Sequence, residues 1–292
     1  MTRRWQADLA LALVALIWGT TFVVVKRALG EISTLYFLAL RFTLAAICML
    51  LLFLPSFRRA GWRTVLRGLR GGAAAGVFLW LGYVLQTTGL KYTSAGNSGF
   101  LTGLYVVLAP LVSATYYRRW PQRIELVGIA IAGAGMLLMT IPEPGDLSAI
   151  NVGDLLTIAC AIAYAIHLVV LGHFSQTEQF EAVAIGQIAL TAILSFTAFP
   201  FDPPRALWSR GVVLAIILTG VFATAIAFSL QTWGQQFTTA TRTALIFALE
   251  PVFALATAVL FGGETLRSMA LIGAALILGG ILTVELKPVR VL

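Results

Sequence analysis

Long runs of apolar residues, separated by short polar segments, follow one another along the whole chain. Each run holds about 20 residues, which is the length that an α-helix needs to cross the hydrocarbon layer of a bilayer. The pattern therefore predicts an all-α integral membrane protein with ten transmembrane helices. The predicted spans are residues 8–27, 34–54, 71–90, 96–116, 124–141, 153–172, 182–200, 211–232, 240–262 and 268–286.

The pattern of the first half returns in the second half. The segment QTTGLKYTSAG at residues 86–96 matches QTWGQQFTTAT at residues 231–241 in its glutamine, glycine, threonine and alanine. Residues 8–24 likewise align with residues 154–170. Each unit holds five spans, and because five is odd the second unit must enter the membrane from the opposite side. The sequence therefore predicts two inverted five-helix repeats, as in secondary transporters.

The repeat divides the chain into a first unit at residues 1–141, a connecting loop at residues 142–152 and a second unit at residues 153–292. The loop, PEPGDLSAINV, is polar and rich in turn residues, as a connector should be. Composition agrees with the membrane assignment, because 59% of the residues are hydrophobic and only 11% are charged, against roughly 25% charged in soluble domains. No polar segment is long enough to form a soluble domain, so the helices and short loops must carry the function.

The net charge of +8 gains its meaning from where the charges lie. With a cytoplasmic N-terminus, twelve lysines and arginines fall on the inner side and six on the outer side, which follows the positive-inside rule. Both termini are then predicted to be cytoplasmic. The basic run at residues 57–70 could also lie on anionic lipid as an interfacial helix, but we favour a topological anchor. Cys48 and Cys160 lie inside spans, so no disulfide is expected.

The ninth predicted span contains Glu250 and Pro251 near its middle. Both are costly there, because proline removes a backbone donor and a carboxylate in hydrocarbon needs a partner, water or a proton. Glu250 could couple a proton, neutralise an ammonium group of a ligand or form a structural ion pair, and the last two are favoured. Its candidate partners are Arg41, His167 and Arg242, although eight residues of helix separate Arg242 from Glu250 by about 12 Å.

Several short motifs occur in a fixed order: Trp18-Gly19, Arg41-Phe42, NSGFLTGLYVVLAP at residues 97–110, and Glu250-Pro251 followed by Gly263-Glu264. In this order the chain resembles the EamA family of the drug/metabolite transporter superfamily, from Asp8 to about Glu285. It is similar to the YddG-type exporters, a resemblance that implies export of aromatic and other amino acids across a bacterial-type inner (plasma) membrane. The resemblance also implies a central cavity surrounded by spans 1, 3, 4, 6, 8 and 9, with spans 5 and 10 packed outside.

Aromatic and polar side chains near the middle of these spans are the candidates for lining such a cavity. A mostly apolar cavity with a few polar groups suits an amphipathic small molecule, and aromatic walls could stack on a ring or cover a cation. For any single aromatic, packing or contact with lipid is the commoner role. The candidates are Trp18, Thr21, Trp80, Tyr83, Asn97, Tyr105, Tyr164, His167, Phe228, Phe247 and Glu250.

Gating residues are expected where the two matched hairpins lie. The turn between spans 3 and 4 should face outside and the turn between spans 8 and 9 inside, so Gln86 and Gln231 are candidate gate residues. Hydrogen bonding between helices explains both amides equally well. Pro110 and Pro251 are candidate hinges, although such kinks are often static.

No set of nucleophile, base and orienting group occurs in the loops, and two histidines with two separate cysteines do not form a metal site. We therefore expect no enzyme activity, no metal and no cofactor, and a monomer that functions alone in the lipid bilayer. The leading hypothesis is a secondary transporter that exports amino acids or similar amphipathic metabolites by alternating access. The alternatives are a multidrug or organic-cation exporter and a membrane scaffold protein that transports nothing.

Overall fold

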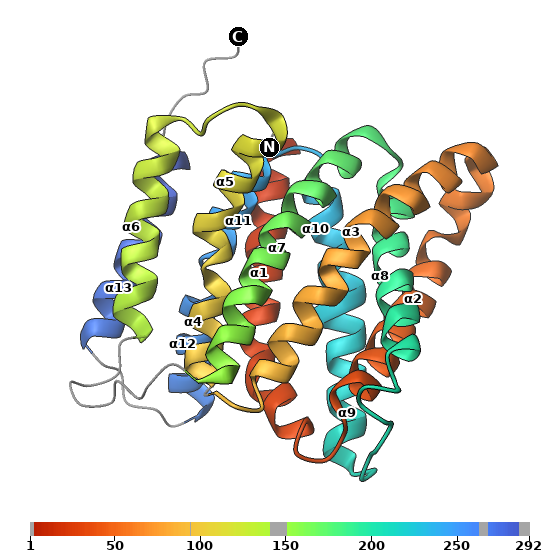
Figure 1. The fold of residues 1–292 in the computed structure, drawn as a ribbon. Helices are drawn as coiled ribbons and strands as arrows, with labels where there is room; N and C mark the ends of the chain where they lie inside the picture. Colours follow the sequence, from red (N-terminus) through yellow and green to blue (C-terminus); the bar gives the residue numbers. More distant parts are fainter. Residues whose placement is uncertain (1–2, 94, 141–150, 263–267, 286–292) are drawn as a thin grey trace.

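The computed structural model describes residues 3–93, 95–140, 151–262 and 268–285, and it is built from helices (Figure 1). Within these ranges there is no strand, only an isolated bridge between Ile32 and Ala206. The helices of the first half are α1 (Arg3–Ala28), α2 (Thr34–Arg59), α3 (Trp62–Gly89), α4 (Ala95–Gly103), α5 (Tyr105–Tyr117) and α6 (Arg123–Thr140). Those of the second half are α7 (Val152–Thr177), α8 (Phe180–Thr197), α9 (Arg210–Gly220), the π-helix η1 (Val221–Ile226), α10 (Ala227–Gly234), α11 (Ala240–Phe247), α12 (Glu250–Gly262) and α13 (Ser268–Glu285).

The all-helical, membrane-spanning character predicted from the apolar runs is confirmed. Seven helical segments of the described residues are long and apolar enough to cross a bilayer, and two shorter apolar helices lie at Leu101–Tyr117 and Ser268–Val284. The total of ten spans stays a prediction. The seven long segments are Arg3–Ala28, Thr34–Arg59, Trp62–Gly89, Val152–Thr177, Phe180–Thr197, Arg210–Gly234 and Ala240–Thr257.

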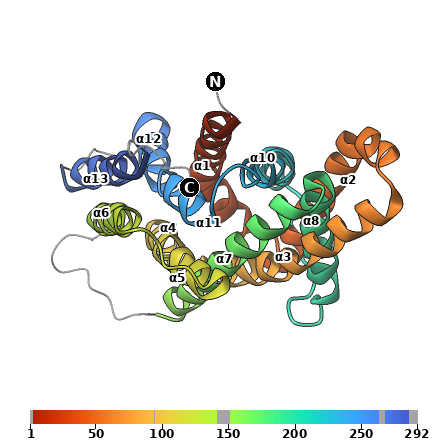
Figure 2. The ribbon, with the colours of Figure 1, turned by 90° about the horizontal axis from the view of Figure 1, so that it is seen from above.

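Helices of each half pack directly against helices of the other half, so the two halves do not form separate bundles. Helix α3 of the first half packs on α7 and α8 of the second, and the α9–η1–α10 segment of the second half packs on α1 and α2 of the first. Helices α6 and α13 pair with each other at one side of the molecule, away from α2 and α8 (Figure 2). The remaining helices thus enclose the centre of the molecule.

Glycines let the helices of opposite halves approach closely. A Cβ added to Gly72 of α3 would lie 2.2 Å from the carbonyl oxygen of Val183 in α8. In the α6–α13 pair, a Cβ on Gly128 would lie 2.7 Å from the carbonyl oxygen of Gly280, and one on Gly280 would lie 2.5 Å from that of Gly128. Small residues at such contacts are typical of membrane helices. Gly128 and Gly280 therefore pack within the chain, while Gly279 of α13 faces open space.

Two of the helical spans are interrupted near their middles. Helix α4 ends at Gly103 and α5 begins at Tyr105, while α11 ends at Phe247 and α12 begins at Glu250. The second interruption has a local cause, since Pro251 has no N–H to donate to the carbonyl of Phe247 one turn earlier. The first is not adjacent to Pro110, which lies inside α5.

The connections α3–α4 and α10–α11 lie at opposite ends of α1. Lys26, in the last turn of α1, donates to the carbonyl oxygen of Thr93 at 3.1 Å. Asp8, near the start of α1, accepts a hydrogen bond from Arg242 of α11 at 3.0 Å. The eighteen residues between Asp8 and Lys26 span about 27 Å of helix. The two matched segments of the sequence are therefore far apart along the long axis of the bundle.

Candidate functional site

A cavity lies between α1, α2, α3, α7, α10 and the interrupted spans. Most of the candidates named from the sequence line it. The lining residues are Trp18, Thr21, Val25, Arg41, Leu79, Tyr83, Gln86, Thr87, Leu90, Thr102, Tyr105, Tyr164, His167, Leu168, Phe228, Gln231, Phe247 and Glu250.

The helices α1 and α3 each present one face to this cavity. In α3 the lining positions 79, 83, 86 and 90 recur at intervals of four, three and four residues, which is the spacing of a single helical face. In α1 the same rule brings Trp18, Thr21 and Val25 together. Gly19, next to Trp18, lets α12 approach α1, because a Cβ there would lie 2.6 Å from the carbonyl oxygen of Glu250.

Arg41 of α2 provides a buried positive charge in the cavity wall. Its Nε donates to Thr224 Oγ1 at 2.7 Å, and its Nη2 donates to the hydroxyl of Tyr83 at 3.2 Å and to the carbonyl oxygen of Ala223 at 3.4 Å. The guanidinium also lies 4.9 Å from the ring centre of Tyr83, an attractive cation–π arrangement. No carboxylate of the described residues lies within ion-pair distance of Arg41.

The π-helix η1 supplies two of these partners. Thr224 and Ala223 both lie in it, and the carbonyl oxygen of Ala223 also accepts the indole N–H of Trp18 at 2.9 Å. The wider turn of a π-helix changes the directions of its carbonyl groups, and π-turns are frequent at functional sites. Here the irregular turn connects the second half to both α1 and α2.

Glu250 places a carboxyl group in another part of the same wall. It is the first residue of α12, where the partial positive charge of a helix N-terminus favours an anion. The hydroxyl of Tyr105 lies 3.5 Å from Glu250 Oε2, which is a long hydrogen bond. Within the described part of the chain no basic side chain forms an ion pair with Glu250. The cavity wall therefore carries one guanidinium and one carboxyl group, and neither has an ion-pair partner in the part of the chain that the structure describes.

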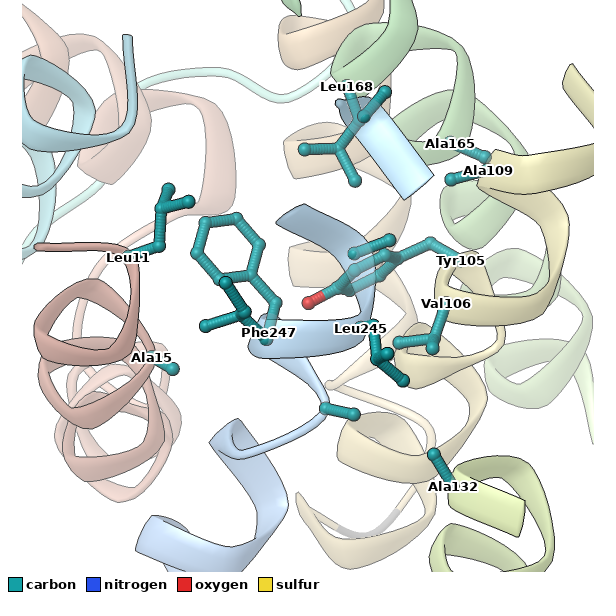
Figure 3. Close-up of a cluster of buried hydrophobic side chains, with 14 of the residues drawn as sticks. Leu11, Ala15, Tyr105, Val106, Ala109, Ala132, Ala165, Leu168, Leu245 and Phe247 are labelled. Atoms are coloured by element: carbon teal, nitrogen blue, oxygen red, sulfur yellow. The ribbon is translucent and has the colours of Figure 1, made fainter. Parts of the chain in front are cut away.

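Aromatic rings form much of the remaining wall. The indole of Trp18 packs against Phe228 and Phe247, with centroid distances of 5.3 and 5.1 Å. Tyr164 packs edge-on against Tyr83 and Tyr105 at 5.7 and 6.5 Å. Phe247 and Tyr105 also belong to a packed cluster that continues to Leu11, Ala15 and Val106 (Figure 3). The rings are thus held by the core rather than free to collapse into the cavity.

Polar side chains between these rings are mostly hydrogen-bonded between helices. Gln86 accepts from the hydroxyl of Tyr164 at 3.2 Å and donates to Thr102 at 3.0 Å. His167 Nε2 lies 2.7 Å from Gln187 Oε1. Gln231 differs from these groups, because its buried Oε1 has no hydrogen-bond partner.

Comparison with known proteins shows to which family the chain around this cavity belongs. The model of the EamA-like transporter family matches the chain at residues 5–141 and again at residues 151–286. The chain belongs to the EamA-like transporter family. An uncharacterized transporter of Archaeoglobus fulgidus is 36% identical over 98% of this chain and 87% of its own length. The uncharacterized transporter YyaM of Bacillus subtilis is 25% identical over 91% of this chain and 88% of its own.

A solved structure, titled only as the crystal structure of a protein, shares the EamA-like fold of this chain. It superimposes with a TM-score of 0.77 over 96% of both chains at 23% identity. Family and relatives together make this chain a multi-pass membrane transporter. The described residues contain no group of three histidine, cysteine, aspartate or glutamate side chains that could hold a metal ion.

Some residues named from the sequence lie outside the cavity of this EamA-like transporter. Trp80 of α3 is half-buried on another face, and its indole N–H has no partner. Arg242 is placed against Asp8 rather than Glu250. Pro110 and Pro251 lie within α5 and α12 and do not line the wall. The side chain of Asn97 lies outside the described residues.

Other lining residues were not named from the sequence. Leu79 and Leu90 lie one and two turns from Tyr83 on the same face of α3, and Val25 follows Thr21 by four residues on α1. Helical spacing from the aromatic candidates would have identified all three. No comparable signal exists for the partnership of Asp8 with Arg242, because 234 positions separate them in the chain.

Proposed function

We propose that this transporter moves zwitterionic, amphipathic metabolites, namely α-amino acids with aromatic or other apolar side chains. The observation that carries the proposal is the cavity wall itself, where Arg41 and Glu250 each lack an ion-pair partner among the described residues while aromatic rings fill the space around them. A ligand with one carboxylate and one ammonium group would neutralise both charges at once.

The recognition chemistry follows from the geometry of each group. A guanidinium binds a carboxylate through two parallel hydrogen bonds, and a carboxylate such as that of Glu250 binds an ammonium group. The apolar side chain of the ligand would then lie against Trp18, Phe228 or Phe247. The unpartnered oxygen of Gln231 could accept a remaining N–H of the ammonium group.

Transport would occur by alternating access between two inverted five-helix repeats. The two separate matches to the family model and the location of the connections α3–α4 and α10–α11 at opposite ends of α1 support this arrangement. With both termini in the cytoplasm, the α3–α4 end would face outside, and the net direction would be export from the cell. One chain would suffice, because α6 and α13 use their glycine-rich faces on each other.

Export of organic cations is the second candidate. Glu250 and the aromatic walls would suit such a ligand as well. The buried guanidinium of Arg41 in the same cavity opposes it, because a bound cation would be repelled by a positive charge that has no counter-ion among the residues that the structure describes. A scaffold protein without transport would leave the cavity and its charges unexplained.

Counterflow into liposomes tests the proposal directly. Liposomes holding the purified protein and unlabelled phenylalanine are diluted into radiolabelled phenylalanine, methionine or tetraethylammonium, with protein-free liposomes as the control. We expect uptake of both amino acids and little of the quaternary amine. Uptake of the amine alone would refute the amino-acid assignment, and no uptake of any probe would favour the scaffold. Repeating the assay with an imposed pH gradient shows whether a proton is coupled.

A further inference from the structure

The α3–α4 connection is tied to two helices of different halves. Lys26 of α1 donates to the carbonyl oxygen of Thr93 at 3.1 Å. The hydroxyl of the same threonine donates to Asp154 Oδ1, at the start of α7, at 2.7 Å. Asp154 is itself fixed, because its Oδ2 accepts the backbone N–H of Asn151 in a capping box. One buried threonine thus connects α3–α4 to the end of α1 and the start of α7.

The α10–α11 connection is tied in the same way at the other end of the bundle. Gln176, near the end of α7, donates to the carbonyl oxygens of Gln235 and Thr238 at 3.1 and 3.0 Å. Arg242 donates to both carboxylate oxygens of Asp8, at 3.3 Å from Nε and 3.0 Å from Nη2. The two charged side chains are only 9% and 17% exposed. The start of α1 and the end of α7 therefore hold this connection.

The two sets of contacts correspond at two positions of the sequence repeat. Thr93 aligns with Thr238 in the sequence repeat, and their carbonyl oxygens accept from Lys26 and Gln176, the side chains at the ends of α1 and α7. Asp154 aligns with Asp8, and each carboxylate binds the connection of the opposite half. The chemistry differs, since Asp154 accepts from a neutral hydroxyl whereas Asp8 forms a bidentate ion pair.

We propose that Asp8–Arg242 and Asp154–Thr93 are two latches, one at each end of the bundle, which must open in turn. This inference rests on the alternating access of the proposed function and assigns the residues that control it. Both latches are closed in this structure. Loss of one latch should therefore shift the protein toward the conformation that is open at that end, with the other end still closed.

The difference in chemistry sets the balance between the two open conformations. A bidentate arginine–carboxylate pair that is mostly buried is stronger than a neutral hydrogen bond, and leaving one of its partners alone and buried is costly. The Asp8–Arg242 end should therefore open less often than the Asp154–Thr93 end. Removing the ion pair should reverse that preference.

Distances between spin labels at each end of the molecule test the latches without any substrate. The background carries Cys48→Ser and Cys160→Ala, which removes both native cysteines. One label pair, at Gln6 and Gln236, reports on the ion-pair end, and a second pair, at Lys91 and Val152, reports on the other end. Double electron–electron resonance in liposomes then gives the distance distribution of each pair.

We expect Asp8→Asn and Arg242→Gln to lengthen the distances of the Gln6–Gln236 pair without lengthening those of the Lys91–Val152 pair. Thr93→Val should lengthen the distances of the Lys91–Val152 pair without lengthening those of the Gln6–Gln236 pair. The charge-swapped variant D8R/R242D should restore the distances of the unmodified protein. If a single variant does not fold, Arg242→Lys, which keeps the charge but loses the bidentate geometry, should give an intermediate shift.

Two results would contradict the proposal that these contacts act as latches. One is an unchanged Gln6–Gln236 distribution in folded Asp8→Asn or Arg242→Lys protein, which would make the pair a static support. The other is equal lengthening at both ends in every variant, which would indicate general loosening. A loss of amino-acid exchange has no bearing on either result, so failure of the substrate assignment remains distinguishable from failure of the latches.

Discussion

At the scale of single residues, the chemistry of the cavity depends on two charges that are held in place by uncharged neighbours. Arg41 is fixed by Thr224, Ala223 and the ring of Tyr83, and Glu250 by the N-terminus of α12 and the hydroxyl of Tyr105. Since these contacts leave the charges without a counter-ion among the described residues, a ligand has the most to contribute there.

Arg41→Gln should remove the carboxylate-binding group. A hydrogen bond to a charged group is worth about 1.5–3 kcal/mol, so exchange of phenylalanine should fall by about tenfold or more. Arg67→Gln is the matched control, because the Arg67 side chain is 65% exposed and does not line the cavity. Initial rates of counterflow measure both variants, and an unaltered rate for Arg41→Gln would exclude the assigned role.

Glu250→Gln should weaken the site for ligands that carry an ammonium group, because the amide keeps the size of the side chain but loses its charge. We expect roughly a tenfold rise in the half-saturating concentration of phenylalanine. Glu178→Gln serves as the control, because Glu178 pairs with Arg67 away from the cavity. Saturation curves of counterflow distinguish the two, and equal curves for both variants would argue against a ligand contact at Glu250.

At the scale of helices, the site depends on close approach and on interruption. Gly19 brings α12 against α1, the break before Glu250 points the N-terminus of α12 at the cavity, and η1 presents two acceptors to Arg41. In the sequence, Pro251 indicates the interruption between α11 and α12. Nothing in the sequence at Leu104 announces the other, and the π-turn of η1 contains neither proline nor glycine, so tertiary packing must decide both.

Gly19→Ala should displace α12, because its Cβ would lie 2.6 Å from one backbone atom and 3.0 Å from another. Overpacking of this kind costs about 1–3 kcal/mol. We expect a lower melting temperature in detergent and slower phenylalanine exchange. Gly279→Ala provides the control, since open space surrounds that position. If both glycine variants had the melting temperature of the unmodified protein, the close approach at Gly19 would not contribute to stability.

At the scale of the whole molecule, the sequence predicts the fold class well and the orientation of side chains poorly. Helix length and apolar runs dictate an all-helical membrane protein, and the described helices follow the predicted spans closely. Which face of a helix turns inward depends on neighbours from the other half. Of two candidates on the same helix, Tyr83 therefore lines the cavity, whereas Trp80 lies on another face. The partner of Arg242 was missed for the same reason.

The central claim is that one cavity recognises both charges of a zwitterion, and truncated ligands test it most directly. Excess unlabelled phenylalanine, phenethylamine, which lacks the carboxylate, or 3-phenylpropionate, which lacks the amine, competes against labelled phenylalanine in counterflow. The account predicts that phenylalanine competes at least about tenfold better than either analogue, and that Arg41→Gln abolishes its advantage over the amine alone. Equal competition by phenethylamine and phenylalanine in the unmodified protein would contradict it.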